Sequence, residues 1–153
     1  MGFSIQKADL FSEEFIALIK AHKALMLSQS PPESSHALLI EGLRVAEIQV
    51  WSLFEGDTLV GCGALKTWDS ETGEIKSMHT VSTLRGKGLG RQMLNHLIEE
   101  ARKKNLHFLK LETGSQEGFL AARKLYESAG FSYCGPFGDY RLDPNSVFMS
   151  LEL

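Results

Sequence analysis

The chain has 153 residues, and its 16 basic and 19 acidic side chains give a formal net charge of −3 at pH 7. This length is typical of one domain, so we expect a single domain over residues 1–153. The slight acidic excess argues against nucleic-acid binding, which normally requires a basic surface. No apolar run approaches the roughly 18 residues of a membrane span, and residues 1–10 lack a signal-peptide pattern. We therefore expect a cytoplasmic protein with no membrane contact.

The cysteines and histidines do not form a pattern typical of a disulfide framework or a metal site. Cys62 and Cys134 are far apart in the sequence, and the five histidines lack H-E-x-x-H or comparable ligand spacing. We therefore expect no metal ion. Cys62 lies in a β-prone run, which favours a small core residue over a nucleophile.

The N-terminal half predicts one helix, one loop and three strands. Apolar residues recur at helical spacing after Ser12, whose hydroxyl can cap the helix, and they continue to Met26. Two prolines and several serines then predict a loop over residues 28–41. Three β-prone runs separated by turn-forming residues predict strands, which we place at 48–54, 59–66 and 74–81.

The C-terminal half alternates helices and strands. An amphipathic helix is predicted over residues 89–101, with Asn105 as its stop, and a strand follows over 107–113. A second helix over 119–129 ends before Gly130, and a last strand covers 147–152. This order of elements predicts an α/β (α+β) fold in a single domain.

A glycine-rich loop, Arg-Gly-Lys-Gly-Leu-Gly at residues 85–90, lies between a predicted strand and the amphipathic helix. Glycines lack the Cβ atom that would block a ligand from the backbone, and the first amides of the helix have no intrahelical acceptor. Arg85, Lys87 and Arg91 add positive charge, so the loop suits a phosphate or pyrophosphate. The spacing fits neither a P-loop nor a Rossmann fingerprint. The alternative is a turn that only connects strand to helix.

Two motifs together resemble the GNAT superfamily of N-acetyltransferases. Arg-x-x-Gly-x-Gly between a strand and a helix resembles the family's acyl-CoA pyrophosphate loop. Residues 122–131 resemble its second hallmark, the A-x-x-L-Y-x-x-x-G-F helix, with Tyr126 as the tyrosine. One position departs from the pattern, because Phe119 stands where many members have an asparagine. The resemblance is clear over residues 51–131.

The resemblance implies a fold and a co-substrate. The fold would be a mixed, largely antiparallel sheet that splays apart at its centre, with helices on both faces. Acetyl-CoA would enter the splay, its pyrophosphate bound by the glycine-rich loop and its pantetheine arm paired with the end of the preceding strand. The residues implied to bind it are Met78, His79, Thr80, Arg85, Gly86, Lys87, Gly88, Leu89, Gly90 and Arg91.

The resemblance also places Tyr126 near the thioester sulfur, where its hydroxyl can protonate the leaving thiolate. The alternative for Tyr126 is a core aromatic on an amphipathic helix. An amine is mostly protonated at pH 7, so a proton acceptor must act before the amine attacks the thioester. We name Glu74 and His79 as candidates and Glu112 as a third, with a water relay or a merely structural role as alternatives for each.

The acceptor is expected to be a small, amino-acid-like amine, since the chain has no long extra segment to dock a protein. Arg44, Lys76 and Arg141 could bind its carboxylate and Asp139 its ammonium, unless they are ordinary surface charges. The predicted activity is direct transfer of the acetyl group from acetyl-CoA to this amine in a ternary complex. The alternatives are acetylation of a protein N-terminus or lysine, and a CoA-binding regulatory module without turnover. A homodimer is compatible with the sequence.

Overall fold

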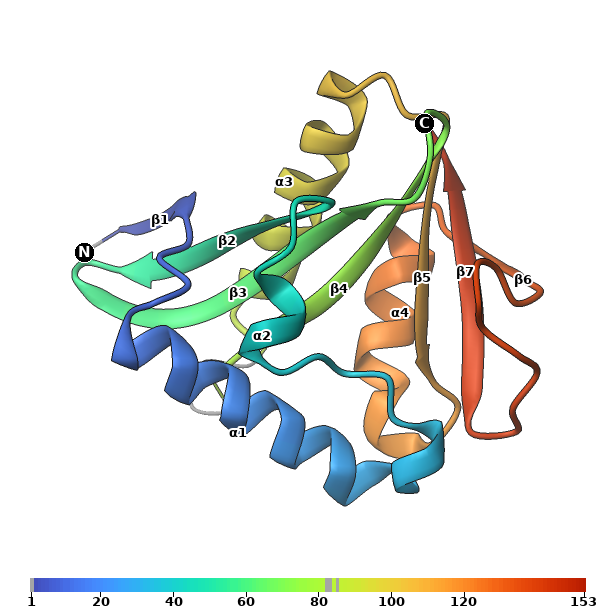
Figure 1. Cartoon of the computed structure of the whole chain (residues 1–153), viewed down its shortest axis with the longest axis horizontal. Helices are drawn as coiled ribbons and strands as arrows, with labels where there is room; N and C mark the ends of the chain where they lie inside the picture. The colour runs from blue at the N-terminus through green and yellow to red at the C-terminus, as the bar shows by residue number, and fades with distance from the viewer. Residues whose placement is uncertain (1, 82–83, 85) are drawn as a thin grey trace.

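A computed structural model describes residues 2–81, 84 and 86–153 (Figure 1). Within these residues, seven strands form one sheet in the order β1-β2-β3-β4-β5-β7-β6. The strands are β1 (Phe3–Lys7), β2 (Ile48–Glu55), β3 (Thr58–Thr67), β4 (Thr72–Thr80), β5 (Phe108–Gly114), β6 (Ser132–Cys134) and β7 (Ser146–Glu152). The helices are α1 (Glu13–Gln29), α2 (Ile40–Leu43), α3 (Leu89–Lys103) and α4 (Leu120–Ser128), with 3-10 turns at Pro32–Ser34 and Glu117–Phe119.

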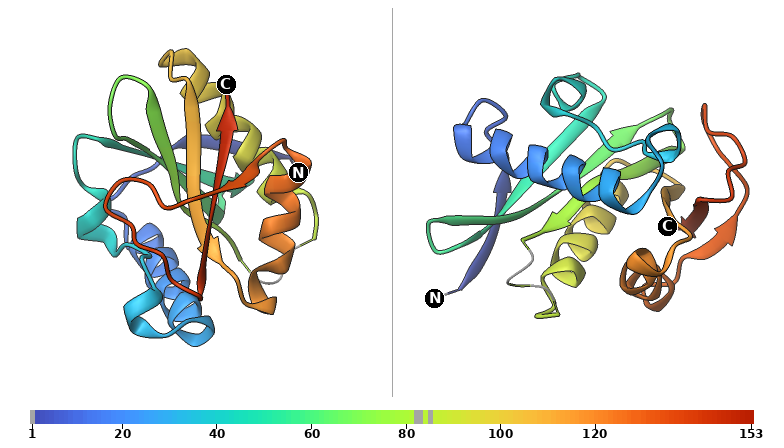
Figure 2. Two further views of the ribbon diagram at one scale, coloured as in Figure 1. Left: turned by 90° about the vertical axis from the view of Figure 1, so that its right-hand side faces the viewer. Right: turned by 90° about the horizontal axis from the view of Figure 1, so that it is seen from below.

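Helices cover both faces of the sheet. Seen from below, α1 lies on one side of the sheet, while α3 and α4 lie on the other (Figure 2). Each face has its own apolar cluster: Phe15 and Ile19 of α1 belong to one, and Met93 and Leu97 of α3 belong to the other. Neighbouring residues of a strand point to opposite faces, so one strand can supply both clusters.

The sheet splays apart between β4 and β5. This pair is parallel and its register covers only Thr72–Glu74 against Phe108–Lys110, whereas the other neighbouring strands of the described sheet are antiparallel. Beyond Glu74 the two strands diverge, and both line a cavity of about 660 Å³ that we call the splay cavity. The expected mixed, largely antiparallel, splayed sheet with helices on both faces is therefore confirmed.

A β-bulge bends β4 at the splay. Cys62 of β3 pairs with His79, but Ala64 pairs with Lys76, so β4 has one more residue than β3 over this stretch. Ser77 within the bulge has φ of 52°, and the Cys62 thiol donates a hydrogen bond to its carbonyl (3.1 Å). A bulge increases local bend and twist, which helps β4 leave β5. Cys62 is buried in the core, as expected.

Four features differ from the sequence-based expectations. β1 and β6 are strands that we did not predict, α1 continues to Gln29, and α2 with a 3-10 turn occupies part of the expected loop over 28–41. These pieces are short, and their partners supply their order: β1 pairs with β2 and β6 with β7. The helix boundaries agree with the predicted start and stop residues. At the start of α1, Ser12 Oγ accepts a hydrogen bond from the Phe15 amide at 3.1 Å. Asn105 and Gly130 have positive φ just after α3 and α4.

The close approach of α3 to β3 generates a stability prediction. A Cβ atom on Gly63 would lie 2.7 Å from Met93 Cγ and 3.1 Å from Leu97 Cδ1, so the Met93 side chain or α3 itself would have to shift. We expect Gly63→Ala to lower the free energy of unfolding by about 1–3 kcal/mol, measured by urea denaturation. Gly135→Ala is the matched control, because no heavy atom lies within 4 Å of its Cβ position. Equal stability of the two variants would contradict the close packing of α3.

Candidate functional site

The glycine-rich loop ends at the N-terminus of α3, beside the splay cavity. Gly86 and Gly88 both have φ of 80°, and among the described residues no heavy atom beyond the chain neighbours lies within 4 Å of the position of a Cβ on either residue. Gly88 is the N-cap, so the first amides of α3 have no acceptor within the helix. Open space, exposed backbone and the positive end of the helix dipole together fit a pyrophosphate.

Most residues expected to bind the cofactor line one cavity. Eight of the ten do so: Met78, His79, Thr80, Gly86, Gly88, Leu89, Gly90 and Arg91. Lys87 is exposed and is not part of the lining, and Arg85 lies outside the described residues. Arg91 donates a hydrogen bond to the Ser128 hydroxyl at the end of α4, which ties the loop side of α3 to α4. The fold thus brings the loop and the end of β4 together.

Tyr126 of α4 also lines the splay cavity. Only 7% of the residue is exposed, and its ring packs edge-on against Phe131 with centroids 5.8 Å apart. Burial raises the pKa of Tyr126 to about 12. The phenol therefore keeps its proton at neutral pH, which is the state that a proton donor needs. Tyr126 thus both packs in the core and borders the splay cavity, because one face of α4 is turned toward the site.

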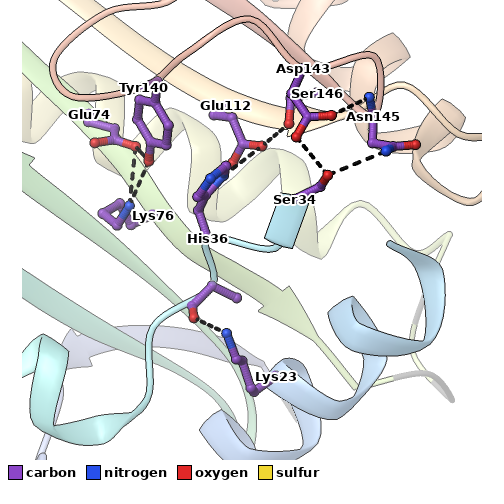
Figure 3. Close-up of polar contacts among 11 residues, drawn as sticks. Lys23, Ser34, His36, Glu74, Lys76, Glu112, Tyr140, Asp143, Asn145 and Ser146 are labelled. Atoms are coloured by element: carbon purple, nitrogen blue, oxygen red, sulfur yellow. Dashed lines mark hydrogen bonds and ion pairs between the residues drawn. The ribbon is translucent and has the colours of Figure 1, made fainter. Parts of the chain in front are cut away.

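Glu74 is held in a buried polar network (Figure 3). Its carboxylate is 1% exposed, and it accepts hydrogen bonds from Trp68 Nε1 (3.0 Å), Tyr140 Oη (2.5 Å) and Lys76 Nζ (3.3 Å). Lys76 Nζ also donates to Tyr140 Oη at 2.9 Å. Burial, followed by the charge of Glu74, raises the pKa of Tyr140, so its hydroxyl stays a donor. Glu74 therefore anchors the loop over residues 135–145 to β4.

Glu112 of β5 forms a second polar contact across the splay cavity (Figure 3). Its Oε2 accepts a hydrogen bond from Ser146 Oγ (2.8 Å) and lies 3.3 Å from His36 Nδ1. Burial raises the pKa of the Glu112 carboxyl. His36 was not selected from the sequence, because it lies in an aperiodic segment and matches no motif. The crossing of this segment over the splay brings it to the site.

His79 lies near the end of β4 and lines the splay cavity. It is half-buried, and its ring centroid lies 4.9 Å from that of His22. Glu74, His79 and Glu112, the three candidate proton acceptors, thus border the same cavity. Their roles in proton transfer stay predictions.

A second cavity of about 500 Å³, which we call the side pocket, adjoins the splay cavity. The two share His36, Lys76 and Tyr140. Charges of both signs line the side pocket, and they include Glu33, Lys66, Lys76, Asp139, Arg141 and Asp143. Arg44 has a different place: its guanidinium donates to the Leu10 carbonyl (2.8 Å) and stacks on Phe11 (4.1 Å), and it lines neither cavity.

In the described part of the chain, no group of three or more His, Cys, Asp or Glu side chains is placed to hold a metal ion. None of its helices combines the length and the apolar character needed to cross a membrane.

Comparison with known proteins identifies the same family over most of the chain. The model of the acetyltransferase (GNAT) family matches residues 13–131. The uncharacterized N-acetyltransferase YsnE of Bacillus subtilis is 54% identical over 95% of this chain and 96% of its own, and YedL of Escherichia coli is 47% identical over 99% and 95%. A GNAT family acetyltransferase from Elizabethkingia anophelis, solved with acetyl-CoA bound, superposes with a TM-score of 0.70 at 19% identity, covering 99% of this chain and 98% of that one.

The open space at Gly88 generates a binding prediction. We expect Gly88→Val to weaken acetyl-CoA binding by at least about tenfold in calorimetry, because a branched side chain would occupy the space beside the helix amides. Any L side chain at positive φ also costs roughly 1–2 kcal/mol in strain. Gly56→Val is therefore the matched control, since Gly56 has φ of 57° in the β2–β3 turn and lines neither cavity. Unchanged affinity in a folded Gly88→Val variant would contradict the assignment.

Proposed function

This chain belongs to the acetyltransferase (GNAT) family and is an acyltransferase, and from that premise we propose that it transfers the acetyl group of acetyl-CoA to the amine of a small-molecule acceptor. The observation that carries this proposal is the junction of two cavities. The splay cavity reaches the glycine-rich loop, and it meets the side pocket at His36, Lys76 and Tyr140. A cofactor and an acceptor can therefore enter from different sides and meet in the splay.

The residues that would hold acetyl-CoA are those that border the splay cavity. The α3 amides at Gly88–Gly90 would bind its pyrophosphate, and the backbone of Met78, His79 and Thr80 would pair with its pantetheine arm. The open Cβ positions at Gly86 and Gly88 support this assignment, because side chains there would fill the space of the ligand. When bound, acetyl-CoA supplies an activated thioester. The protein supplies orientation, proton transfer and exclusion of water.

Direct transfer in a ternary complex agrees with the environment of the cysteines. Cys62 is 1% exposed, and burial raises the pKa of its thiol to about 12, so it is not a thiolate nucleophile. Cys134 is exposed and lines neither cavity. An acyl-enzyme formed on either residue is therefore disfavoured.

We assign the donor role to Tyr126, and we retain Glu74 as a residue that acts on the acceptor side of the reaction and His79 as a residue that borders the cofactor. Tyr126 keeps its proton at neutral pH and borders the splay cavity. The three donors around Glu74 suit a carboxylate that positions Lys76 and Tyr140. The backbone of His79 would pair with the cofactor, and its ring would form part of the wall of the splay cavity.

The mixed charge of the side pocket supports an amino-acid-like acceptor. Lys66 and Arg141 can attract a carboxylate, while Asp139 and Asp143 can attract an ammonium. A small molecule that carries both charges matches this lining better than a simple alkylamine does.

We also propose that residues 1–153 form one N-acetyltransferase domain, because strands from both ends of the chain join the same sheet.

The direct test measures CoA thiol release from acetyl-CoA with a panel of amines. The panel contains free amino acids, alkylamines of similar size without a carboxylate, and peptides with a free N-terminus or lysine. We expect the highest kcat/KM with a carboxylate-bearing small amine. Release with peptides alone would indicate a protein acetyltransferase, and tight CoA binding without any release would indicate a regulatory module. Either result would contradict the proposal.

The role of Tyr126 makes a kinetic prediction. Phenylalanine keeps the ring and its burial but removes the only proton that the side chain can donate. General acid catalysis typically contributes about 10²–10⁴-fold, and a phenol with pKa of about 12 is a weak acid. We therefore expect Tyr126→Phe to lower kcat about 100-fold, at the low end, with unchanged acetyl-CoA affinity and melting temperature. Tyr133→Phe is the matched control, because Tyr133 is exposed and outside both cavities. Equal kcat in Tyr126→Phe and the parent, measured where chemistry limits the rate, would make Tyr126 a packing residue.

A further inference from the structure

We propose that His36 takes the proton from the acceptor's ammonium group and that Glu112 positions His36 for this step. The inference rests on the proposed function and deepens it by naming the proton acceptor. It comes from the arrangement of side chains where the splay cavity meets the side pocket.

The location of His36 distinguishes it from the other candidates. Glu74, His79 and Glu112 line the splay cavity but are not part of the side-pocket lining. His36 lines both cavities and is 36% exposed in its side chain. All four residues lie within the described part of the chain. An amine that enters through the side pocket would therefore meet His36 on its way to the thioester.

The contact with Glu112 sets the tautomer of His36. A neutral imidazole has one N–H and one acceptor nitrogen, and the N–H is the one that faces a carboxylate. Nδ1 lies 3.3 Å from Glu112 Oε2, so Nδ1 carries the hydrogen and Nε2 keeps its lone pair. Within the described residues, Nε2 has no hydrogen-bond partner, which leaves it available to an ammonium. The Glu112 carboxylate would also stabilise the imidazolium that forms.

The segment that carries His36 is anchored on both sides of the residue (Figure 3). Ser34 Oγ donates to Asp143 Oδ2 at 2.6 Å and accepts from Asn145 Nδ2 at 3.3 Å, and Lys23 Nζ donates to the Ala37 carbonyl at 2.7 Å. The ring itself packs edge-on against Tyr140, with centroids 5.1 Å apart. These contacts fix the backbone and the ring plane, which a group that transfers protons requires.

Titratable groups from several elements line the two cavities together with His36. They are Glu112 from β5, Glu74 and Lys76 from β4, Tyr140 and Asp143 from the loop over 135–145, and Glu33 from the segment of His36 itself. Lys76 is paired with Glu74, so the carboxylate of Glu112 is the charge in direct contact with the ring.

The step needs one protonated amine and one thioester, and no other reactant. One ammonium proton passes to His36 Nε2 and then to water. The nitrogen lone pair forms the C–N bond as the C–S bond breaks, and the electron pair of that bond leaves with sulfur. The nitrogen loses a second proton to water as the amide forms. Sulfur takes a proton from Tyr126, and the Tyr126 phenolate regains one from water, so the net products are the amide, the CoA thiol and one proton.

The test compares His36→Gln with the parent and with His107→Gln, using the best amine of the panel. His107 is the matched control, because it also lies beside a glutamate (3.6 Å from Glu71) but is exposed and outside both cavities. We expect His36→Gln to lower kcat about 100-fold or more and to change the low-pH limb of kcat/KM, with unchanged acetyl-CoA affinity. We expect added imidazole to restore part of the rate of His36→Ala. A parental rate and pH profile in folded His36→Gln would overturn the proposal.

The double variant tests the positioning role of Glu112. If Glu112 acts through His36, Glu112→Gln lowers kcat and shifts the low-pH limb in the parent, but it adds little in the His36→Gln background. Independent, multiplicative losses would overturn this part of the proposal and make Glu112 a separate proton acceptor. Thiol release by the parent enzyme distinguishes failure of the His36 proposal from failure of the proposed function. Thiol release by the parent with a parental rate in His36→Gln overturns only the His36 proposal, whereas no release with any amine overturns the proposed function as well.

Discussion

The divergence of β4 and β5 after three paired residues is the constraint on which the site depends. Backbone groups at the edges of two strands normally pair with each other, and their separation leaves them facing a cavity. The connection between these parallel strands runs through α3, so the N-terminus of a helix lies at the end of β4. One topological feature thus places the diverging strand backbone, the first helix amides and a cavity side by side. This combination can bind a long ligand with a pyrophosphate at one end.

The polar groups inside the splay show how the two flanking loops become part of the site. Glu74 and Glu112 lie on the two strands that diverge, and each accepts hydrogen bonds from a different segment. Burying a carboxylate is unfavourable unless donors surround it. Tyr140 therefore brings the loop over 135–145 onto Glu74, and Ser34 links the His36 segment to Asp143 in the same loop. Side-chain hydrogen bonds thus join parts of the cavity wall that are distant in sequence.

Sequence reasoning reached furthest where the signal is local. The glycine-rich loop and the α4 motif are short stretches whose residue types are dictated by a turn, a helix start and a helix stop. The loop, Tyr126 and the end of β4 could therefore be named together as candidates, and they line one cavity. It missed β1, β6 and α2, which are short and obtain their order from β2, β7 and the core. It also missed His36, because nothing in an aperiodic segment indicates which side chain will face a cavity. Arg44 was expected near the acceptor, but its hydrogen bonds to Leu10 direct it elsewhere.

The sequence by itself determined the alternation of helices and strands and supplied a set of candidate residues. The glycine-rich loop and the motif around Tyr126 also indicated a family of acetyl-CoA-dependent enzymes. These properties follow from periodicity and from motifs within about ten residues, where backbone geometry restricts residue choice. Only the tertiary structure decided that Glu74 is enclosed by Trp68, Lys76 and Tyr140, that Glu112 contacts His36, and that two cavities meet there. The physical reason is that such contacts join residues up to 111 positions apart, as in Ser34 and Asn145. Their formation depends on how strands diverge and loops cross, which no local pattern encodes.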